Sequence, residues 1–339
     1  MRPRLEIEFD LRQQGRFLWG KPYVPGQNEF LFDHGRSAIL LALSSLKLSK
    51  GSNVGMMAYN CHTVMNVISQ VGCKPIFVDV NEDLTIDIED LRKKSGLFSV
   101  LIVSHLFGFV NDIQLIKNEF PDILIIEDCA HSYGIEHLYG DFATFSLGQG
   151  KFPSLGDGGI LLVINENYLA EVRREYQQVP SYSMVENVNL FARMWINAFL
   201  YRPWLYGWLT LPMKRRRSSS ISKVGIRPKK MSRGVSAMYA SNKNQVADVI
   251  ERRLSNSAKR IQYIDKDVNN YAIGVNAFML VAWCDNPRLL QSELNKRGID
   301  SATHFSRCVE WAVEFGYRYG DCPNTELLVK NLLMIPTYF

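Results

Sequence analysis

The sequence predicts an α/β fold, in which a mainly parallel sheet covered by helices is followed by a smaller α+β domain. In the first half, short runs that are apolar throughout alternate with segments whose apolar residues recur at helical spacing, as is typical of parallel strands buried on both faces. In the second half the alternation stops, and a long polar helix precedes a single strand and helix. At 339 residues, 47% of them hydrophobic, the chain is large enough for two domains.

The first-half elements follow from these runs in order. Parallel sheets bind ligands beyond the carboxyl ends of their strands, and Asp128 occupies such a position at the end of an apolar run. The expected strands are residues 54–59, 74–80, 99–106, 123–128 and 142–147, with a further strand at 158–164, and the helices between them are residues 37–48, 62–72 and 112–120.

The second half is expected to hold a long helix at residues 236–264, a strand at 276–284 and a helix at 286–298, capped by Asn286 and ended at Gly298. The segment between the halves carries three of the six tryptophans and is interrupted by a proline, so it is a poor membrane span. We expect these tryptophans to pack in the core or a dimer interface, with a membrane belt as the alternative. They are Trp195, Trp204 and Trp208.

The net charge of +5 is concentrated in one segment. Residues 214–233 hold nine Lys or Arg and no acid, which leaves −4 (5 − 9) for the rest of the chain. The segment is serine-rich and lacks interleaved aromatics, so it does not predict nucleic-acid binding. The six cysteines form no CxxC pair and no zinc-type spacing with histidine, so we expect neither disulfides nor a metal, and a reducing cytoplasm. The N-terminus does not match a secretory signal.

The stretches "IIEDCAHSYG" and "FSLGQGKFPSLGDGG" carry the chemistry. The first ends a strand in Asp128, and the second places Lys151 in a glycine-rich turn 23 residues later. The GxxxxGK[ST] spacing of a nucleoside-triphosphate loop is absent. A lysine that forms a Schiff base and a carboxylate that keeps a pyridine nitrogen protonated are the pair that pyridoxal 5'-phosphate (PLP) requires. The sequence therefore favours PLP as the cofactor.

The phosphate of this cofactor also has a candidate site. Gly35, Arg36 and Ser37 immediately precede a predicted helix, whose amide groups and dipole attract anions. Ser146, five residues before Lys151, is placed to donate a hydroxyl to the same phosphate. Taken singly, each of these residues has an ordinary structural interpretation, as a helix cap or a solvated loop residue. Their order and spacing in a βα context favour the cofactor.

Over nearly its whole length the sequence resembles the PLP-dependent sugar aminotransferases of the DegT/StrS type. The matching motifs include "GRSAILLAL", "IIEDCAHSYG", "FSLGQGKFPSLGDGG" and "KKMSRGVSAMYA". The resemblance implies the PLP-dependent transferase type I fold and a cytoplasmic homodimer with shared active sites. It also implies transfer of an amino group from glutamate to a nucleotide-linked keto sugar, for amino-sugar or surface polysaccharide synthesis. The implied roles are Lys151 as the Schiff-base lysine and proton carrier, Asp128 on the pyridine nitrogen, His131 near the ring hydroxyl, and Ser146 with the Arg36 and Ser37 amides on the phosphate.

The chain departs from the family pattern in three places. Cys61 stands where relatives place an aromatic residue over the cofactor ring, and is therefore expected to contact the cofactor. Pro228 stands where an asparagine commonly reaches the neighbouring subunit's phosphate, and Arg227, Lys229 and Lys230 are candidates to supply charge to substrate instead. The chain stops at Phe339, where relatives continue with a final helix, so we expect a shortened small domain.

Several alternatives remain at this stage. His304 and Arg307 match a substrate-side motif, with solvated loop residues as the alternative. His105 is expected either to line the cofactor pocket or to serve as a structural hydrogen-bonding residue. The basic residues from Lys214 to Arg217 are expected either to contact a membrane surface or to be solvated. The alternative functions are a sugar dehydratase, in which relatives replace the lysine by histidine, and a PLP-binding or interaction protein with weakened catalysis.

Overall fold

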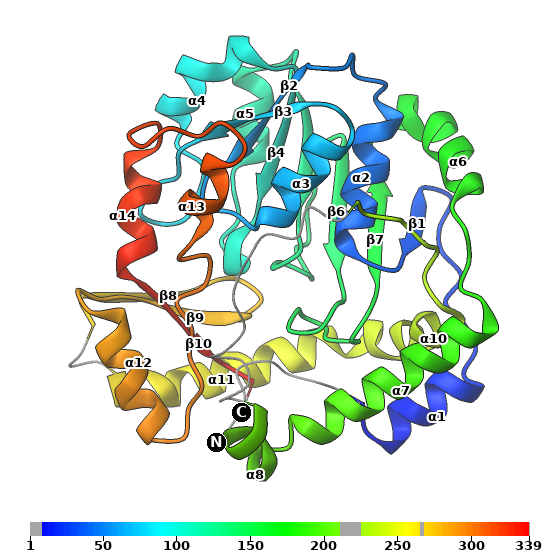
Figure 1. Cartoon of the computed structure of the whole chain (residues 1–339), viewed down its shortest axis with the longest axis vertical. Coiled ribbons are helices and arrows are strands. Elements are labelled where there is room, and N and C mark those ends of the chain that lie inside the picture. Colours follow the sequence, from blue (N-terminus) through cyan, green and yellow to red (C-terminus); the bar gives the residue numbers. More distant parts are fainter. Residues whose placement is uncertain (1–8, 211–224, 265–267, 339) are drawn as a thin grey trace.

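The computed structural model of the chain describes residues 9–210, 225–264 and 268–338. Its centre is a seven-stranded sheet in the order β1-β7-β6-β5-β4-β2-β3, with α2 and α3 across the face toward the viewer in Figure 1. The predicted α/β fold with a mainly parallel sheet is confirmed. The strands are β1 (Glu29–Phe32), β2 (Asn53–Met57), β3 (Lys74–Val78), β4 (Val100–Ser104), β5 (Leu124–Asp128), β6 (Phe142–Ser146) and β7 (Gly159–Val163).

One strand of this sheet runs against the others. The pairs from β6 through β5, β4 and β2 to β3 are all parallel, whereas β7 is antiparallel to both β6 and β1. The reversal arises because β6 and β7 are joined by a loop at 147–158 and not by a crossover helix, which parallel neighbours require. This loop carries Lys151. It therefore places the lysine at the edge of the sheet where β6 ends. The short edge strand β1 was not among the predicted strands.

The helices of the first half begin at side chains suited to capping. Asp10, Asp112 and Ser183 each accept a bond from a backbone amide in the first turn of their helix, as N-cap residues do. The predicted anion-binding helix begins at Gly35, so residues 35–37 form its first turn and do not precede it. The helices are α1 (Leu11–Trp19), α2 (Gly35–Ser45), α3 (His62–Gln70), α4 (Ile88–Lys94), α5 (Ile113–Glu119), α6 (Leu169–Gln178), α7 (Met184–Leu200) and the short α8 (Pro203–Leu205).

The second half contains more elements than the sequence suggested. The long helix predicted at 236–264 is present as α10 and α11, separated by a 3-10 turn at Lys243–Gln245. The cap predicted at Asn286 is confirmed, since its side chain accepts from the Leu289 amide at 3.0 Å. The division that the sequence suggests, an N-terminal arm at 1–30, a large domain at 31–235 and a small domain at 236–339, remains a prediction. The elements are α10 (Arg233–Asn242), α11 (Val246–Ile264), α12 (Pro287–Lys296), α13 (Cys308–Val313), α14 (Pro323–Asn331), and an antiparallel sheet of β8 (Asn270–Ile273), β9 (Met279–Trp283) and β10 (Leu332–Pro336), in the order β10-β9-β8.

The expectation that these tryptophans pack in the core was wrong, whereas their packing in a dimer interface stays a prediction. Trp195 on α7, Trp204 on α8 and Trp208 in the π-helical turn at Tyr206–Thr210 are 50%, 63% and 85% exposed. The basic residues from Lys214 to Arg217 lie outside the described residues.

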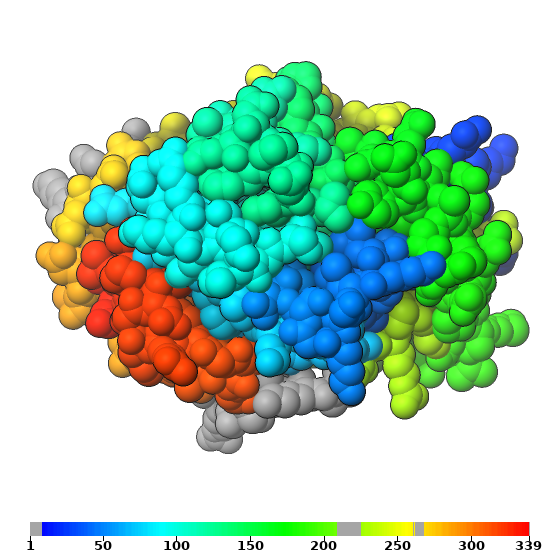
Figure 2. All heavy atoms as spheres, turned by 90° about the horizontal axis from the view of Figure 1, so that it is seen from above, coloured from blue at the N-terminus to red at the C-terminus, as the bar shows by residue number. Residues whose placement is uncertain are grey.

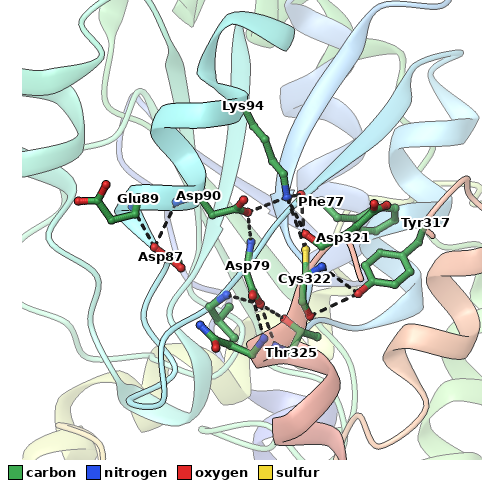
Figure 3. A network of polar contacts seen from close by, with 12 residues as sticks. Phe77, Asp79, Asp87, Glu89, Asp90, Lys94, Tyr317, Asp321, Cys322 and Thr325 are labelled. Atoms are coloured by element: carbon green, nitrogen blue, oxygen red, sulfur yellow. Dashed lines mark hydrogen bonds and ion pairs between the residues drawn. The ribbon is translucent and has the colours of Figure 1, made fainter. Parts of the chain in front are cut away.

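A buried aspartate fastens the C-terminal helix α14 to the edge of the main sheet. Asp79, directly after β3, is 2% exposed and accepts bonds from the Asn324 amide (2.9 Å), the Thr325 amide (2.8 Å) and the Thr325 hydroxyl (2.7 Å) (Figure 3). Beside it, Lys94 Nζ donates to the carbonyl oxygens of Phe77 and Asp321. In Figure 2 the orange-red C-terminal segment accordingly lies against the cyan part of the chain, far from it in sequence.

We expect Asp79→Ala to destabilise the protein by roughly 2–4 kcal/mol, because three donors from the start of α14 would lose a buried acceptor. The measurement is the shift of the urea unfolding midpoint. The matched control Asp122→Ala, at an exposed aspartate, should change stability by no more than about 0.5 kcal/mol. Equal shifts in the two variants would contradict the role given to Asp79.

Candidate active site

A pocket of about 230 Å³ lies beyond the carboxyl ends of β4 and β5. It brings together residues from six separate segments of the sequence, and five of these contain residues that the sequence analysis singled out. Ser37 is buried one residue further into α2 and lines an adjoining pocket of about 310 Å³, which shares Arg36 and Thr63 with the first. The predicted cofactor residues in the first pocket are Gly35, Arg36, Cys61, Asp128, His131, Ser146 and Lys151.

Lys151 is positioned by the loop between β6 and β7. Its amide donates to the Gly148 carbonyl at 3.0 Å, and the Gly150 amide donates to Ser154 Oγ at 3.1 Å. Burial lowers the pKa of Lys151, although the nearby Cys61 and Asp128 oppose the shift. The lysine therefore has a larger neutral fraction than an exposed amine, as a nucleophile or base requires.

Asp128 ends β5 and is 6% exposed. Burial raises the pKa of this carboxyl group, while Lys151, the Ala130 amide and Ser104 act in the opposite direction. The Ala130 amide donates to Oδ1 at 3.1 Å, and Ser104 Oγ donates to Oδ2 at 3.2 Å. Both carboxylate oxygens thus have a donor, which favours the charged form that a pyridinium nitrogen needs as its partner.

Ser104 is itself oriented by a second buried residue. Asn60 Nδ2 donates to Ser104 Oγ at 2.8 Å, so the serine proton remains available for Asp128. Ser104 and Asp128 are direct partners in the parallel register of β4 and β5. Sequence reasoning missed both Asn60 and Ser104. The sequence shows that Ser104 is a polar residue near the end of the apolar run at 99–106. It does not show that Asp128 lies beside it, because that depends on the order of the strands.

His131 is enclosed by aromatic rings. Its ring lies 4.9 Å from that of Phe107 and 5.0 Å from that of Phe278, both nearly parallel to it. Burial, followed by the positive charge of Lys151 and the proximity of His304, holds the pKa of His131 well below its usual range. The imidazole is therefore neutral at ordinary pH and suits a contact with a ring hydroxyl better than a charge-based role.

His105 both lines the pocket and serves as a structural hydrogen-bonding residue, the two alternatives that the sequence left open. Both of its ring nitrogens have partners. The Asn111 amide donates to Nδ1 at 3.1 Å, so Nε2 carries the proton and donates to Glu127 at 2.9 Å. A ring nitrogen of His105, a carboxylate oxygen of Glu127 and the sulfur of Cys129 lie within 4.8 Å of one another. Burial, however, raises the pKa of Cys129 well above its usual value. A protonated thiol does not ligate metals, and we assign no metal here.

Cys61 lies at the start of α3 with two polar neighbours. Thr63 Oγ1 donates to its sulfur at 3.0 Å, and His62 Nδ1 lies 3.9 Å from it. Burial acts to raise the pKa of this thiol, but the contacts with His62 and Thr63 outweigh it, so the pKa lies below its ordinary value. The residue that replaces an aromatic ring in this pocket is therefore a polarised thiol.

None of the five substrate-side candidates lines this pocket, although Arg227 lines the adjoining one. The ring of His304 lies 5.6 Å from that of His131, against the pocket wall. Arg307 pairs with Glu310 at 2.5 Å and lines a different cavity. Lys229 pairs with Glu186 and lies over a tyrosine ring, while Lys230 lies over the ring of Tyr176.

The pocket meets three requirements of PLP, which are a lysine amine, an acid for the ring nitrogen, and an anion site at a helix start. The third depends on Gly35, since a Cβ there would lie 2.8 Å from the Cβ of Ser146. The first turn of α2 consequently lies directly against Ser146. Helix N-termini of this kind bind phosphate, so the residues present fit the cofactor.

A mainly parallel sheet with a lysine-bearing reversed hairpin and an acid at the end of the neighbouring strand defines the class of fold found in PLP-dependent sugar aminotransferases. The chain belongs to the DegT/DnrJ/EryC1/StrS aminotransferase family, whose model matches residues 31–339. This confirms the resemblance inferred from the motifs.

Curated relatives are similar over part or most of the chain. GDP-perosamine synthase of Escherichia coli O157:H7 is 30% identical over 146 residues, which are 40% of each chain. A dTDP-3-amino-3,4,6-trideoxy-alpha-D-glucose transaminase of Micromonospora megalomicea is 26% identical over 154 residues, 42% of this chain and 41% of the relative. The match therefore spans about two fifths of these relatives. An uncharacterised protein of Methanocaldococcus jannaschii is 23% identical over 88% of this chain and 78% of its own length.

Solved structures share the fold over nearly the full chain. A Streptococcus pneumoniae protein described as a sugar aminotransferase, in its PMP form, has a TM-score of 0.75 at 15% identity, covering 99% of this chain and 92% of the other. A GDP-4-keto-6-deoxymannose-3-dehydratase with bound GDP-perosamine has a TM-score of 0.71 at 17% identity, covering 100% and 96%. At these identities the likeness concerns the fold.

In the protein without added cofactor, we expect iodoacetamide to alkylate Cys61 before the other five cysteines, which are buried. The pH midpoint of its labelling should lie below that of an ordinary thiol, as mass spectrometry of the labelled peptide would measure. Thr63→Val should raise the midpoint by removing the hydroxyl donor, whereas Thr63→Ser, which keeps a hydroxyl, should not. A midpoint unaffected by Thr63→Val would contradict the proposed hydrogen bond.

Proposed function

We propose that the protein is a PLP-dependent aminotransferase that transfers the amino group of glutamate to a nucleotide-linked keto sugar. We further propose that it acts in the cytoplasm as a homodimer with shared active sites, for amino-sugar or surface polysaccharide synthesis. The observation that carries the proposal is that Lys151 and Asp128 line one pocket. Burial there lowers the pKa of Lys151 as its role requires, and two donors oppose the effect of burial on Asp128. Family membership supports the reaction class.

The roles of the residues follow from their surroundings. When bound, PLP would supply an electron sink that stabilises negative charge at the carbon bearing the amino group. Asp128, with its two donors, would hold the proton of the pyridine nitrogen. Lys151 Nζ has the lowered pKa that suits it to accept the proton from Cα of the amino donor and later deliver one to the keto carbon of the sugar. Gly35 and Ser146 bring the anion site to one end of the pocket.

The nucleotide diphosphate also has a candidate site. Arg36 faces both pockets, and Arg227 lines the adjoining one. The segment bearing Arg227 is held to α3 by a pair of bonds between Gln70 and the Ile226 backbone, at 2.7 and 2.6 Å. Two guanidinium groups suit diphosphate recognition. We therefore favour Arg227 over Lys229 and Lys230 as the substrate cation of this segment.

Two other functions were considered. A sugar dehydratase shares the fold, as the structural comparison illustrates, but Lys151 occupies the position at which a dehydratase is expected to have histidine. A binding protein with weakened catalysis is favoured by Cys61 alone among the pocket residues.

The half-reaction with the amino donor tests the proposed function directly. The protein loaded with PLP should be converted to the pyridoxamine form by glutamate, as absorbance spectra would show, and returned by a nucleotide-linked 4-keto or 3-keto sugar. Glutamine and alanine serve as alternative donors. No conversion with any donor would reject the aminotransferase function, and conversion by another donor would reject glutamate.

Lys151→Ala should abolish the borohydride-reducible attachment of PLP while the protein still folds, because no covalent anchor would remain in the pocket. Mass spectrometry after reduction measures the attachment, and circular dichroism checks the fold. Lys243→Ala, at a lysine beside the ring of Tyr23, is the control and should keep the adduct. An adduct that persists in Lys151→Ala would assign the anchor to another lysine.

Asp128→Asn should lower kcat by at least about a hundredfold while PLP still binds, since a neutral side chain stabilises the pyridinium poorly. Ser104→Ala should have a smaller effect, about three- to tenfold. It removes a donor to the charged carboxylate and thus raises the pKa of Asp128, so the pH-dependent absorbance change of bound PLP should move to higher pH. Ser104→Thr keeps the hydroxyl and should restore the midpoint. An unchanged midpoint in Ser104→Ala would contradict this positioning role.

A further inference from the structure

The outward side of α7 exposes large apolar side chains toward both ends of the helix, with Asn189 and Arg193 exposed between them. The six side chains of this α7 face, between 40% and 85% exposed, are Met184, Val185, Val188, Trp195, Ile196 and Phe199. Their spacing places them on one side of the helix. The opposite side packs inward through Leu190 and Met194. Helix α7 is thus apolar on two sides, of which the protein buries one.

Neighbouring helices extend the α7 face. Helix α1 packs against α7 through Phe17 and Phe191, whose rings are 5.3 Å apart, and itself exposes Leu11, Leu18 and Trp19, the last by 86%. At the other end, Phe199 lies between Trp195 and Trp204, at ring distances of 6.2 and 6.1 Å. Figure 1 shows α1, α7 and α8 together along one edge of the molecule. Contiguous exposed apolar surface of this kind marks a binding site.

The charges on these helices distinguish between two kinds of partner. Helices α1 and α7, with the N-caps of α1 and α8, carry four arginines, at positions 12, 16, 193 and 202, and two acids, Asp10 and Glu186. Glu186 is ion-paired with Lys229, Arg193 lies 3.4 Å from the carboxylate of Asp157, and Arg202 lies over the ring of Phe199 at 5.6 Å. A second copy would bring the same excess of positive charge and too few acids to pair with these arginines across an isologous interface. An anionic lipid surface attracts them.

The residue types on α1, α7 and α8 also favour a lipid surface as the partner. Tryptophan and arginine are the residues enriched where a helix lies in the interface of a bilayer, with tryptophan at headgroup depth. Among the described residues, no helix has both the length and the apolar character needed to cross a bilayer. At 1.5 Å per residue, the 17 residues of α7 extend about 26 Å, which suits a helix lying in the membrane plane.

We propose that the α7 face, with the exposed side chains of α1 and α8, seats the protein on an anionic lipid bilayer. The apolar side chains and tryptophans enter the interfacial layer, and the arginines contact lipid phosphates. This function is independent of the reaction proposed above.

Co-sedimentation with vesicles tests the proposal on the full chain. The protein should partition onto phosphatidylcholine vesicles containing phosphatidylglycerol about tenfold or more better than onto pure phosphatidylcholine, with the preference reduced at high salt. When the vesicles contain brominated lipids, they should quench the tryptophan fluorescence of the unmutated protein. Absence of both binding and quenching would overturn the proposal.

A matched pair of double variants locates the surface. Val185→Asp with Val188→Asp should lower vesicle partition by about tenfold or more. Val275→Asp with Val313→Asp changes the same residue types at positions 60% and 45% exposed elsewhere and should leave partition unchanged. Equal losses in both, or none in the first, would overturn the proposal. Sedimentation velocity without lipid completes the test, since a dimer that becomes monomeric only in the α7 variant would assign the face to a second copy.

Discussion

The pocket depends on keeping one buried carboxylate charged. Asp128 has almost no access to water, and burial alone favours its neutral form. The protein opposes this with a backbone amide on one oxygen and an oriented hydroxyl on the other, together with the positive charge of Lys151. The positive charge of Lys151 thus favours the ionised aspartate, while the aspartate only partly offsets the effect of burial, which lowers the pKa of the lysine.

The sheet topology makes this arrangement possible. Parallel strands β4 and β5 end at the same edge, which places Ser104 beside Asp128. The reversal of β7 sends the intervening loop back over that edge with Lys151 on it. A parallel β7 would need a crossover helix in place of this loop. The antiparallel pairing of β7 with β6 is therefore the feature that completes the pocket.

The sequence predicted the parts of the site whose signal lies in neighbouring residues, and it missed the parts that depend on contacts between distant segments. Lys151, Asp128 and Gly35 were found because their own types, order and neighbouring elements signal the chemistry. Asn60 and Ser104 were missed because their importance depends on which strands are adjacent. The exposure of Trp195 was misjudged because apolar spacing identifies the sides of a helix without showing which one the protein covers. Strand β1 was missed because four residues carry too little periodicity.

The attachment of α14 has a consequence for the order of folding. Asp79 and Thr325 are separated by 246 residues, so the carboxylate emerges from the ribosome roughly 10 to 50 s before its partners at ordinary rates of synthesis. Until then it remains solvated, and β9 lacks the pairing with β10 that directly follows α14. An unpaired strand edge invites association with other chains. Docking of α14 on Asp79 is thus a late event in synthesis, and it coincides with the arrival of β10, which pairs with the open edge of β9.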